Sequence, residues 1–325
     1  MNNNTSTICM TTYIYGDTYQ DYIPLLVYSL QKSYPSYSII LFINGILRED
    51  IDKVLHTNDL YNNLEIIENT FSDCPEMNPL KAMTLRWVLW SEKFNNFDYI
   101  YIVDIDMLYF KEPITLIEQH VKHLNILSLP FSNIKRPYKI PVLDLMFLAR
   151  RFKYSGLKGV LKSIFKGGQI EYRASGLHFI KRKEYYAKLT PEKRNFYKSI
   201  IYNGDMFKYI INPDNEAFLY WMLNDIGFNP IKMGTQKSVL QMLDFDRFEQ
   251  KDFRPHHGIH LGMFRTDILD DTNTKIMKSK PYIYYCSKYL EYANDSLFQK
   301  IVKESSEKVK LYISKLNSYL NENVE

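Results

Sequence analysis

Two aspartates follow a short apolar run and are separated from each other by a single residue. Asp104 and Asp106 come directly after the run 99–103. On an extended chain alternate side chains share a face, so we expect the two carboxylates to point the same way with Cα atoms about 6.6 Å apart. Two like charges so close need a nearby cation, and carboxylate oxygens suit Mg²⁺ or Mn²⁺. The sequence therefore predicts a divalent metal holding a phosphorylated substrate where a strand ends.

The elements that must position these acids alternate between strand-like and helix-like runs. This alternation is typical of a mainly parallel central sheet with helices on both faces, here a Rossmann-type α/β fold. The chain then ends in a helical tail whose apolar spacing predicts one helix from about Leu297. We expect strands at 8–15, 38–43, 64–67, 99–103, 125–129 and 177–180, and helices at 22–33, 80–94 and 216–223, with a charged helix ending at Leu55.

Composition and charge exclude several classes of protein. The 325 residues are 46% hydrophobic and 24% charged, as in a folded protein that buries a large core. A formal net charge of +4 does not indicate a nucleic-acid-binding protein. Cys9, Cys74 and Cys286 are too few and too widely spaced for a disulfide framework. No signal-peptide pattern and no apolar stretch of the roughly 20 residues that span a bilayer are present, so we expect a cytoplasmic protein.

Two common nucleotide-binding patterns are missing from the sequence. No Gly-x-Gly-x-x-Gly follows the first strand, and no phosphate loop ends in Gly-Lys-Ser or Gly-Lys-Thr. Dinucleotide dehydrogenases and common nucleotide hydrolases are therefore disfavoured. A lone Asp-x-Asp triplet is also found in turns and helix caps, but its position after an apolar strand favours the metal interpretation.

Several further motifs occur in an order that resembles a known enzyme family. They are the opening strand with Tyr13, Tyr15 and Asp17, the helix 81–86, the Asp104–Asp106 triplet, the segment 175–180, Asp214-Asn215-Glu216, and the loop 254–265 with His256, His257 and His260. This order resembles nucleotide-sugar-dependent glycosyltransferases of the GT-A fold. It is most similar to the retaining family-eight enzymes, which include bacterial lipooligosaccharide galactosyltransferases and glycogenin.

The resemblance implies a role for each matching position around the donor. Asp104 and Asp106 would bind Mn²⁺ or Mg²⁺ at the donor diphosphate, with Asp104 also near the ribose or sugar. Arg86 would reach the donor, although a surface ion pair is an equal alternative. The opening loop, from Tyr13 through Tyr15 to Asp17, would hold the nucleoside, and a tyrosine would stack on the base; a core tyrosine is the alternative there.

A histidine in the carboxyl-terminal part of the family's domain completes the coordination of the metal. Imidazole ligates Mn²⁺ readily, so we expect His260, and after it His257, to take this role. The family separates this histidine from a following glycine by two residues, whereas His260 and Gly262 are separated by one. Loop histidines without any metal remain the alternative.

The triplet Asp214-Asn215-Glu216 opens a helix, so it has both a capping and a catalytic interpretation. As a cap it would place acids in the first turn. In the resembling enzymes this place lies close to the reacting sugar carbon. Asn215 would match the family's amide, and Glu216 would serve as a base only in an inverting mechanism.

The segment 131–172 is predicted to be a basic insertion on the acceptor side of the domain. Between Asp144 and Glu171 there are no acidic residues, and lysines and arginines alternate with apolar residues from Phe147 to Phe165. Such a segment favours peripheral contact with an anionic membrane that carries a glycolipid acceptor, and a solvated helical hairpin is the alternative. The terminal helix is expected to pack on the domain, or else to form a homodimer or touch the membrane.

These inferences predict a catalytic domain at 1–265 and a helical extension at 266–325. The expected reaction moves a sugar from a nucleoside diphosphate sugar, favouring UDP, to a hydroxyl of a glycan or glycolipid, with retention. One rival is a metal-dependent nucleotidyltransferase or phosphodiesterase, which would normally show a carboxylate for a second metal. The other is a non-catalytic glycan-binding or assembly protein with the same fold.

Overall fold

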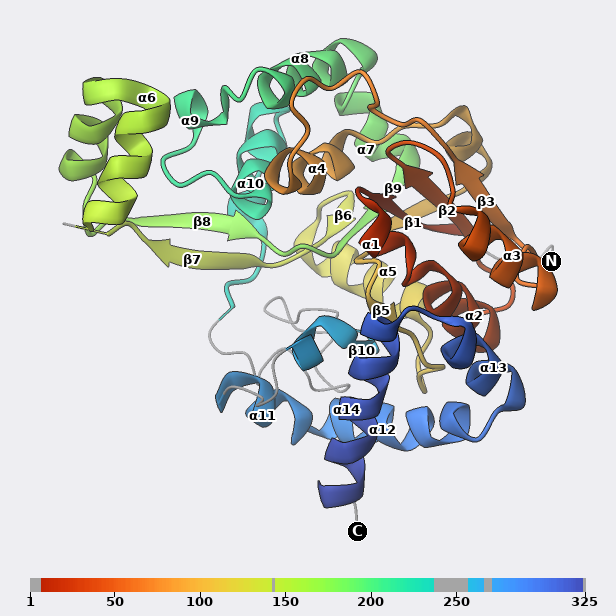
Figure 1. Cartoon of the computed structure of the whole chain (residues 1–325). Coiled ribbons are helices and arrows are strands. Elements are labelled where there is room, and N and C mark those ends of the chain that lie inside the picture. Colours follow the sequence, from red (N-terminus) through yellow and green to blue (C-terminus); the bar gives the residue numbers. More distant parts are fainter. Residues whose placement is uncertain (1–6, 142–143, 237–256, 266–270, 324–325) are drawn as a thin grey trace.

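A mostly parallel sheet of six strands forms the centre of the protein. The computed structural model describes residues 7–141, 144–236, 257–265 and 271–323 (Figure 1). The first four strands of the spatial order β3-β2-β1-β4-β9-β6 are parallel, and β9 is antiparallel to both of its neighbours. The α/β fold class is therefore confirmed. The strands are β1 (Ile8–Ile14), β2 (Ser38–Ile43), β3 (Leu64–Ile67), β4 (Tyr99–Ile102), β6 (Phe131–Ser132) and β9 (His178–Lys181).

The alternation of side chains along the strands supplies two cores, one on each face of the sheet. In β1, Ile8 and Met10 belong to one core, whereas Cys9 and Tyr13 belong to the other. Figure 1 shows α2, α12, α13 and α14 on one side of the sheet and α4, α8 and α10 on the other. Both faces are thus covered, which explains why β1, β2 and β4 are mostly apolar.

The helices vary from one turn to more than four turns. Short 3₁₀ turns at Arg86–Val88, Glu92–Asn96, Pro230–Lys232 and Leu261–Arg265 connect some of them. The helices are α1 (Asp17–Gln20), α2 (Ile23–Ser33), α3 (Glu49–Thr57), α4 (Pro79–Leu85), α5 (Leu116–Leu127), α7 (Arg182–Lys188), α8 (Pro191–Tyr202), α9 (Met206–Tyr209), α10 (Asn215–Asp225), α11 (Asp271–Met277), α12 (Lys280–Ala293), α13 (Ser296–Glu304) and α14 (Glu307–Asn323).

The basic insertion forms an arm that extends from the sheet. Its base is an antiparallel ribbon of β7 (Lys135–Lys139) and β8 (Ile170–Ala174), and α6 (Leu145–Phe165) connects the two strands. A non-helical residue, Gly156 with φ 60°, interrupts α6, so that its two halves fold back on each other (Figure 1).

Three predicted elements differ in the structure. Residues 125–129 do not form a strand, because 125–127 continue α5, whose buried face recurs with helical spacing at Leu116, His120, Leu124 and Leu127. The helix expected over 80–94 ends at Leu85 and is followed by two 3₁₀ turns, and the segment between them includes the extended residue Leu89. The single terminal helix is two helices, because Ser305 after α13 is extended, with ψ 167°.

The last helix packs into the main core. The apolar side of α14, represented by Val309, Ile313 and Leu316, is buried with β1 and α2 in the same cluster. This apolar stripe is therefore already covered within the chain and does not offer the surface expected of a homodimer. No helix among the described residues has the length and apolar character that a membrane-crossing segment needs.

Candidate active site

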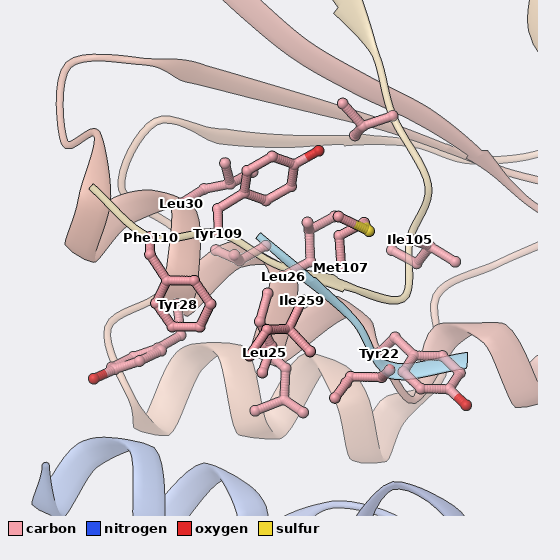
Figure 2. Packing of buried hydrophobic residues seen from close by; sticks show 14 of the residues in the cluster. Tyr22, Leu25, Leu26, Tyr28, Leu30, Ile105, Met107, Tyr109, Phe110 and Ile259 are labelled. Atoms are coloured by element: carbon pink, nitrogen blue, oxygen red, sulfur yellow. The ribbon is translucent and has the colours of Figure 1, made fainter. Parts of the chain in front are cut away.

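The two aspartates lie in the turn that follows the central strand β4. This strand ends at Ile102, so Asp104 and Asp106 lie in the turn before the two-residue strand β5 (Met107–Leu108), and not on an extended strand as predicted. The intervening Ile105 is 7% exposed and packs with Met107 in the core beside α2 (Figure 2). Burial of these alternate residues fixes the turn and leaves both aspartates lining one cavity.

A short ribbon brings His260 to the second aspartate. β10 (Ile259–His260) pairs antiparallel with β5, so that His260 lies opposite Met107. The backbone N–H of Leu261 donates to the carbonyl of Asp106 at 2.8 Å. His260 Nε2 then lies 3.0 Å from Asp106 Oδ1. Backbone pairing thus holds together two side chains that are more than 150 residues apart in the sequence.

Each member of this pair changes the proton affinity of the other. Burial alone would raise the pKa of Asp106, but the nearby His260 outweighs it and the pKa falls below its usual value. Burial would likewise lower the pKa of His260, but the Asp106 carboxylate outweighs it and raises the pKa. The pair therefore favours an ionised Asp106 carboxylate beside a His260 imidazole that binds a proton more readily than usual.

Gly262 allows this close approach. A β carbon at this position would lie 2.7 Å from Asp106 Oδ2 and 2.8 Å from His260 Cε1. Both distances are shorter than van der Waals contact, so a side chain at position 262 would force the Asp106 carboxylate or the His260 ring to shift.

Arg86 reaches the first aspartate from the end of α4. Its Nη1 donates to Asp104 Oδ1 at 2.5 Å, and its guanidinium lies 4.2 Å from the centre of the Trp87 ring. The Arg86 side chain is 10% exposed, whereas that of Asp104 is 33% exposed. This pair is largely buried in the cavity, so the surface ion pair that we considered as an alternative does not describe it.

The cavity joins these groups to the end of β1. Its volume is about 280 Å³, and Tyr13 and Tyr15 line it together with Arg86, Asp104, Asp106 and His260. Strands β1 and β4 are adjacent and parallel, so their carboxyl ends open at the same edge of the sheet. Tyr13 is buried with its hydroxyl donating to the carbonyl of Thr70, and the Tyr15 hydroxyl donates to the carbonyl of Met77.

Two predicted residues lie elsewhere. Asp17 is exposed at the start of α1 and does not line the cavity. His257 is buried, with Nδ1 2.7 Å from Glu112 Oε1 and Nε2 3.2 Å from His120 Nε2. Both ring nitrogens of His257 face protein partners. The expectation that His257 could replace His260 as the metal ligand is therefore wrong. His256 lies outside the described residues.

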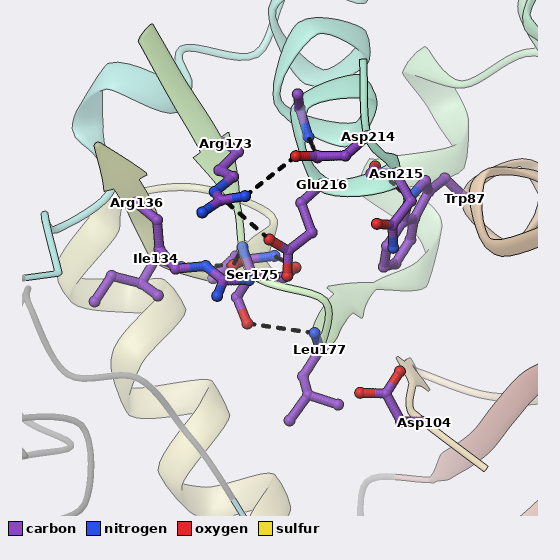
Figure 3. Close-up of polar contacts among 12 residues, drawn as sticks. Trp87, Asp104, Ile134, Arg136, Arg173, Ser175, Leu177, Asp214, Asn215 and Glu216 are labelled. Atoms are coloured by element: carbon purple, nitrogen blue, oxygen red, sulfur yellow. Dashed lines mark hydrogen bonds and ion pairs between the residues drawn. The ribbon is translucent and has the colours of Figure 1, made fainter. Parts of the chain in front are cut away.

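A second polar cluster begins at the start of α10. Asp214 caps this helix, because its carboxylate accepts from the backbone N–H of Ala217 at 2.6 Å. Arg173 of β8 donates to Asp214 at 3.2 Å, and Glu216 forms ion pairs with Arg136 of β7 and Arg173 (Figure 3). The capping interpretation of Asp214 is thus confirmed, and the ribbon supplies two cations that the sequence analysis did not identify.

Asn215 contributes its backbone to the connection between the two clusters. The indole N–H of Trp87 donates to the carbonyl of Asn215 at 2.8 Å. The guanidinium of Arg86 also lies over the ring of Trp87. These contacts hold α10 and the end of α4 together beside the cavity. The contacts of the Asn215 side chain do not assign it a chemical role.

Gly176 lies between the two clusters. A β carbon here would be 3.0 Å from Arg86 Nη2 and 3.3 Å from Glu216 Oε1. The acids at 104 and 106 are therefore connected to the α10 cluster through Arg86 and this glycine. The prediction named the segment 175–180 but not this role, which becomes visible only when β9 and α10 are assembled.

The cavity also contains residues that the motifs did not indicate. Tyr19, Met83 and Arg265 line it. Arg265 ends the 3₁₀ turn after His260 and lowers the pKa of Asp106 along with the histidine. Arg265 belongs to the loop 254–265 that the motifs named for its histidines, but they did not single it out.

The donor atoms fit a divalent ion that shares its coordination with a ligand. In the described part of the chain, no three His, Cys, Asp or Glu side chains are arranged to hold a metal ion by themselves. Asp106 and His260 supply an oxygen and a nitrogen, while Asp104 is partly occupied by Arg86. Ions of the Mg²⁺ type usually keep waters and bind through one or two carboxylates together with substrate phosphates, and this set of residues meets that requirement.

Comparison with known proteins gives similarity at the level of solved structures alone. No family model and no curated protein matches the sequence. The chain is similar to core-mannan synthase A of Aspergillus fumigatus in its Mn/GDP form, with 11% identity, 73% of each chain covered and a TM-score of 0.42. It is similar to the galactosyltransferase LgtC in complex with donor and acceptor sugar analogues, with 14% identity, 66% of this chain and 70% of that chain covered, and a TM-score of 0.34.

A third similar structure is the bifunctional glycosyltransferase WbbM. The identity is 8% and the TM-score 0.39; 95% of this chain aligns with 52% of that chain, so the present sequence spans about half of its length. At such low identities and TM-scores the similarity concerns the general arrangement of the chains, and the functional argument depends on the site itself.

Proposed function

We propose that this protein is a metal-dependent glycosyltransferase with a GT-A-like catalytic domain. It transfers a sugar from a nucleoside diphosphate sugar, most simply a UDP-sugar, to a hydroxyl of a glycan or glycolipid. The observation that carries the proposal is the single cavity in which Asp104, Asp106 and His260 meet Arg86 and the tyrosines of the opening strand.

This set of residues matches the parts of a nucleotide-sugar donor. The oxygens of Asp106 and Asp104 with the nitrogen of His260 would hold Mn²⁺ or Mg²⁺, which would neutralise negative charge on the leaving diphosphate. Arg86 offers a planar guanidinium for a phosphate oxygen or a sugar hydroxyl. Tyr13, Tyr15 and Tyr19 supply aromatic surface for the nucleoside.

The α10 cluster supports a retaining reaction more than an inverting one. An inverting enzyme needs a carboxylate that accepts the acceptor's proton. The Glu216 carboxylate is instead directed to Arg136 and Arg173, which favours a role in positioning the acceptor side of the site. We assign Asn215, which begins the same helix, as the polar residue that lies next to the reacting carbon of the sugar.

The exposed helix of the insertion supports a lipid-linked acceptor. Phe152, Leu157, Leu161 and Phe165 on α6 are all exposed, in a segment without acidic residues between 144 and 171. Apolar side chains among lysines and arginines suit the surface of an anionic membrane. We propose that α6 contacts the membrane and so brings the site to glycolipid acceptors.

A panel of nucleotide sugars tests the proposed donor site. A ligand that binds only the native state raises the melting temperature, so at least one nucleoside diphosphate sugar should do so in the presence of Mn²⁺ and not in EDTA. Asp106→Asn should abolish this shift. The matched control is Asp50→Asn on exposed α3, which makes the same chemical change away from the cavity.

Product analysis separates the proposal from its rivals. Mn²⁺-dependent release of free nucleoside diphosphate with transfer of the sugar identifies a glycosyltransferase, whereas transfer of a nucleotidyl group identifies a nucleotidyltransferase. If no nucleotide sugar stabilises the protein with any divalent ion, the donor-site assignment is wrong and a glycan-binding protein becomes the better interpretation.

A further inference from the structure

A second cavity lies on the other side of the α10 cluster, between the arm and the helices. Its volume is about 260 Å³, and residues of β7, β8, α9 and α10 line it. Its aromatic lining consists of Tyr138, Tyr172, Tyr209, Tyr220 and Trp221. These rings are half-buried or exposed, so each leaves part of its surface open.

Four of the five rings pack against each other in two pairs, and the fifth packs against an arginine. Tyr172 and Tyr220 have centroids 5.9 Å apart, and Tyr209 and Trp221 have centroids 4.7 Å apart with 33° between their planes. The guanidinium of Arg173 lies 5.6 Å from the centre of the Tyr138 ring. Because each ring has a neighbour that restricts it, the cavity presents aromatic surface with little rotamer freedom left to lose on binding.

Polar groups are distributed among these rings. Glu171 and Asp214 offer carboxylate oxygens, Arg173 offers guanidinium N–H groups, and the amides of Asn212 and Asn224 can both donate and accept. A sugar ring combines an apolar C–H face with a rim of hydroxyls that donate and accept in turn. Apolar aromatic faces with a few placed polar groups are the lining that such a ligand requires.

The cavity is connected to the proposed catalytic site by shared residues. Asp214 and Arg173 line the cavity, and Arg173 also approaches Glu216, with Nε 3.9 Å from Oε2. Glu216 and Arg86 both reach Gly176, and Arg86 binds Asp104. Figure 3 shows Arg173 directed to Asp214 and to Glu216 at this end of the connection.

We propose that this aromatic cavity is a saccharide-binding subsite that holds a sugar unit of the acceptor at a distance from the reacting hydroxyl. The inference rests on the proposed function for the identity of the ligand as an acceptor. Its chemistry does not suit a second nucleotide, because Glu171 and Asp214 would face the phosphates. An acceptor of two or more sugar units would extend from this cavity toward the proposed catalytic site.

Saccharide binding can be measured without donor or metal. Saturation-transfer NMR titrations would use the methyl glycosides of glucose, galactose, mannose and N-acetylglucosamine, with lactose and maltose as disaccharides. At least one probe should bind to the wild-type chain. Tyr209→Ala should weaken it about fivefold to tenfold through loss of ring contact, and Tyr209→Phe should retain most of the affinity.

A matched control removes an apolar side chain of similar exposure outside the cavity. Leu290 on α12 is 40% exposed and Tyr209 is 41% exposed, and only Tyr209 lines the cavity. Leu290→Ala should therefore leave saccharide binding unchanged. Equal losses in the two variants would overturn the proposal, as would the absence of binding by every probe or displacement of the saccharide by a nucleoside diphosphate.

Two further measurements keep this inference separate from the proposed function. Asp106→Asn should preserve saccharide binding, because it changes only the donor site. In the transfer reaction, Tyr209→Ala should raise the KM for a disaccharide acceptor and leave donor hydrolysis unchanged. If saccharide binding depends on Tyr209 but the protein shows no metal-dependent nucleotide binding, the subsite is supported and the transferase proposal is wrong. If the acceptor KM does not change in Tyr209→Ala, the subsite does not bind the acceptor.

Discussion

His260 Nε2 lies 3.0 Å from Asp106 Oδ1, and this pair joins the loop before the C-terminal helices to the turn after the central strand. Neither residue could hold a divalent ion firmly alone. Their proximity depends on the antiparallel pairing of β5 with β10 and on a glycine two residues after the histidine. The backbone therefore fixes the geometry of the proposed metal site before any ligand binds.

Gly262→Ala should weaken metal binding without unfolding the protein. The new β carbon would collide with Asp106 Oδ2 at 2.7 Å and with His260 Cε1 at 2.8 Å, so the pair must separate. We expect Mn²⁺ affinity, measured by electron paramagnetic resonance titration, to fall by about tenfold or more, which is roughly 1.4 kcal/mol. Circular dichroism should show a cooperative melt as in the wild type. Wild-type Mn²⁺ affinity in this variant would contradict the assigned ligands.

Gly176→Ala should affect transfer more than metal binding. Its β carbon would press on Arg86 Nη2 at 3.0 Å and Glu216 Oε1 at 3.3 Å, so these side chains must shift by a few tenths of an ångström. Small displacements of positioning groups can cost large factors in rate. We expect a lower kcat with Mn²⁺ affinity unchanged. A loss of Mn²⁺ affinity equal to that of Gly262→Ala would show that the two clusters are not separable.

Arg86→Lys and Arg86→Gln should weaken nucleoside diphosphate binding in that order. Lysine keeps the charge but loses the planar fork, and glutamine loses both. Isothermal titration should show an increase in Kd of about tenfold for lysine and more for glutamine, because hydrogen bonds to charged groups contribute roughly 1.5–3 kcal/mol. In an Asp104→Asn background the effect of Arg86→Gln on melting temperature should shrink, since the pair is already broken. Equal Kd values for all three chains would remove Arg86 from the donor site.

His178 should make the protein less stable in mild acid. It is fully buried, with Nδ1 accepting from Asn133 at 2.9 Å, and burial with a further contribution from Arg86 lowers its pKa from 6.5 to about 3. The unfolded chain therefore binds a proton that the native chain does not between these pH values. The stabilising contribution is complete above about pH 6.5 and declines as the pH falls, by about 1.4 kcal/mol per pH unit.

Urea unfolding between pH 4 and pH 7 measures this effect. His178→Gln retains an acceptor for Asn133 and removes the titration, so the free energy of unfolding should vary less with pH in this variant. The buried His120, whose pKa is also lowered by burial and then by its neighbouring histidines, leaves part of the pH dependence in both chains. Identical pH slopes would mean that His178 does not remain neutral in the native state.

Local patterns were sufficient for five of the six strands of the sheet and for the position of the acids after β4, but not for β6. The continuous apolar runs of β1, β2 and β4 identified buried parallel strands, and the acids after β4 identified the open edge of the sheet. The short run 125–129 was ambiguous, because a few apolar residues fit a strand or the end of a helix equally well. Residues 125–127 are helical because they continue α5, whose buried residues recur at helical spacing.

The site residues that sequence analysis missed all depend on long-range packing. Arg136 and Arg173 reach Glu216 because β7 and β8 pair across the whole insertion. The choice between His257 and His260 depends on the register of β10 with β5, which turns one imidazole to Glu112 and the other to Asp106. Spacing along the chain contains no signal for either relationship.

The packing of α14 on the 3₁₀ turn Leu261–Arg265 has a consequence for biosynthesis. During translation the acid turn can form once the central strands have left the ribosome, but the histidine loop gains its support only when α14 follows much later. The nascent chain therefore passes through a period in which it has carboxylates without a fixed imidazole partner. The proposed metal site is therefore completed late in folding.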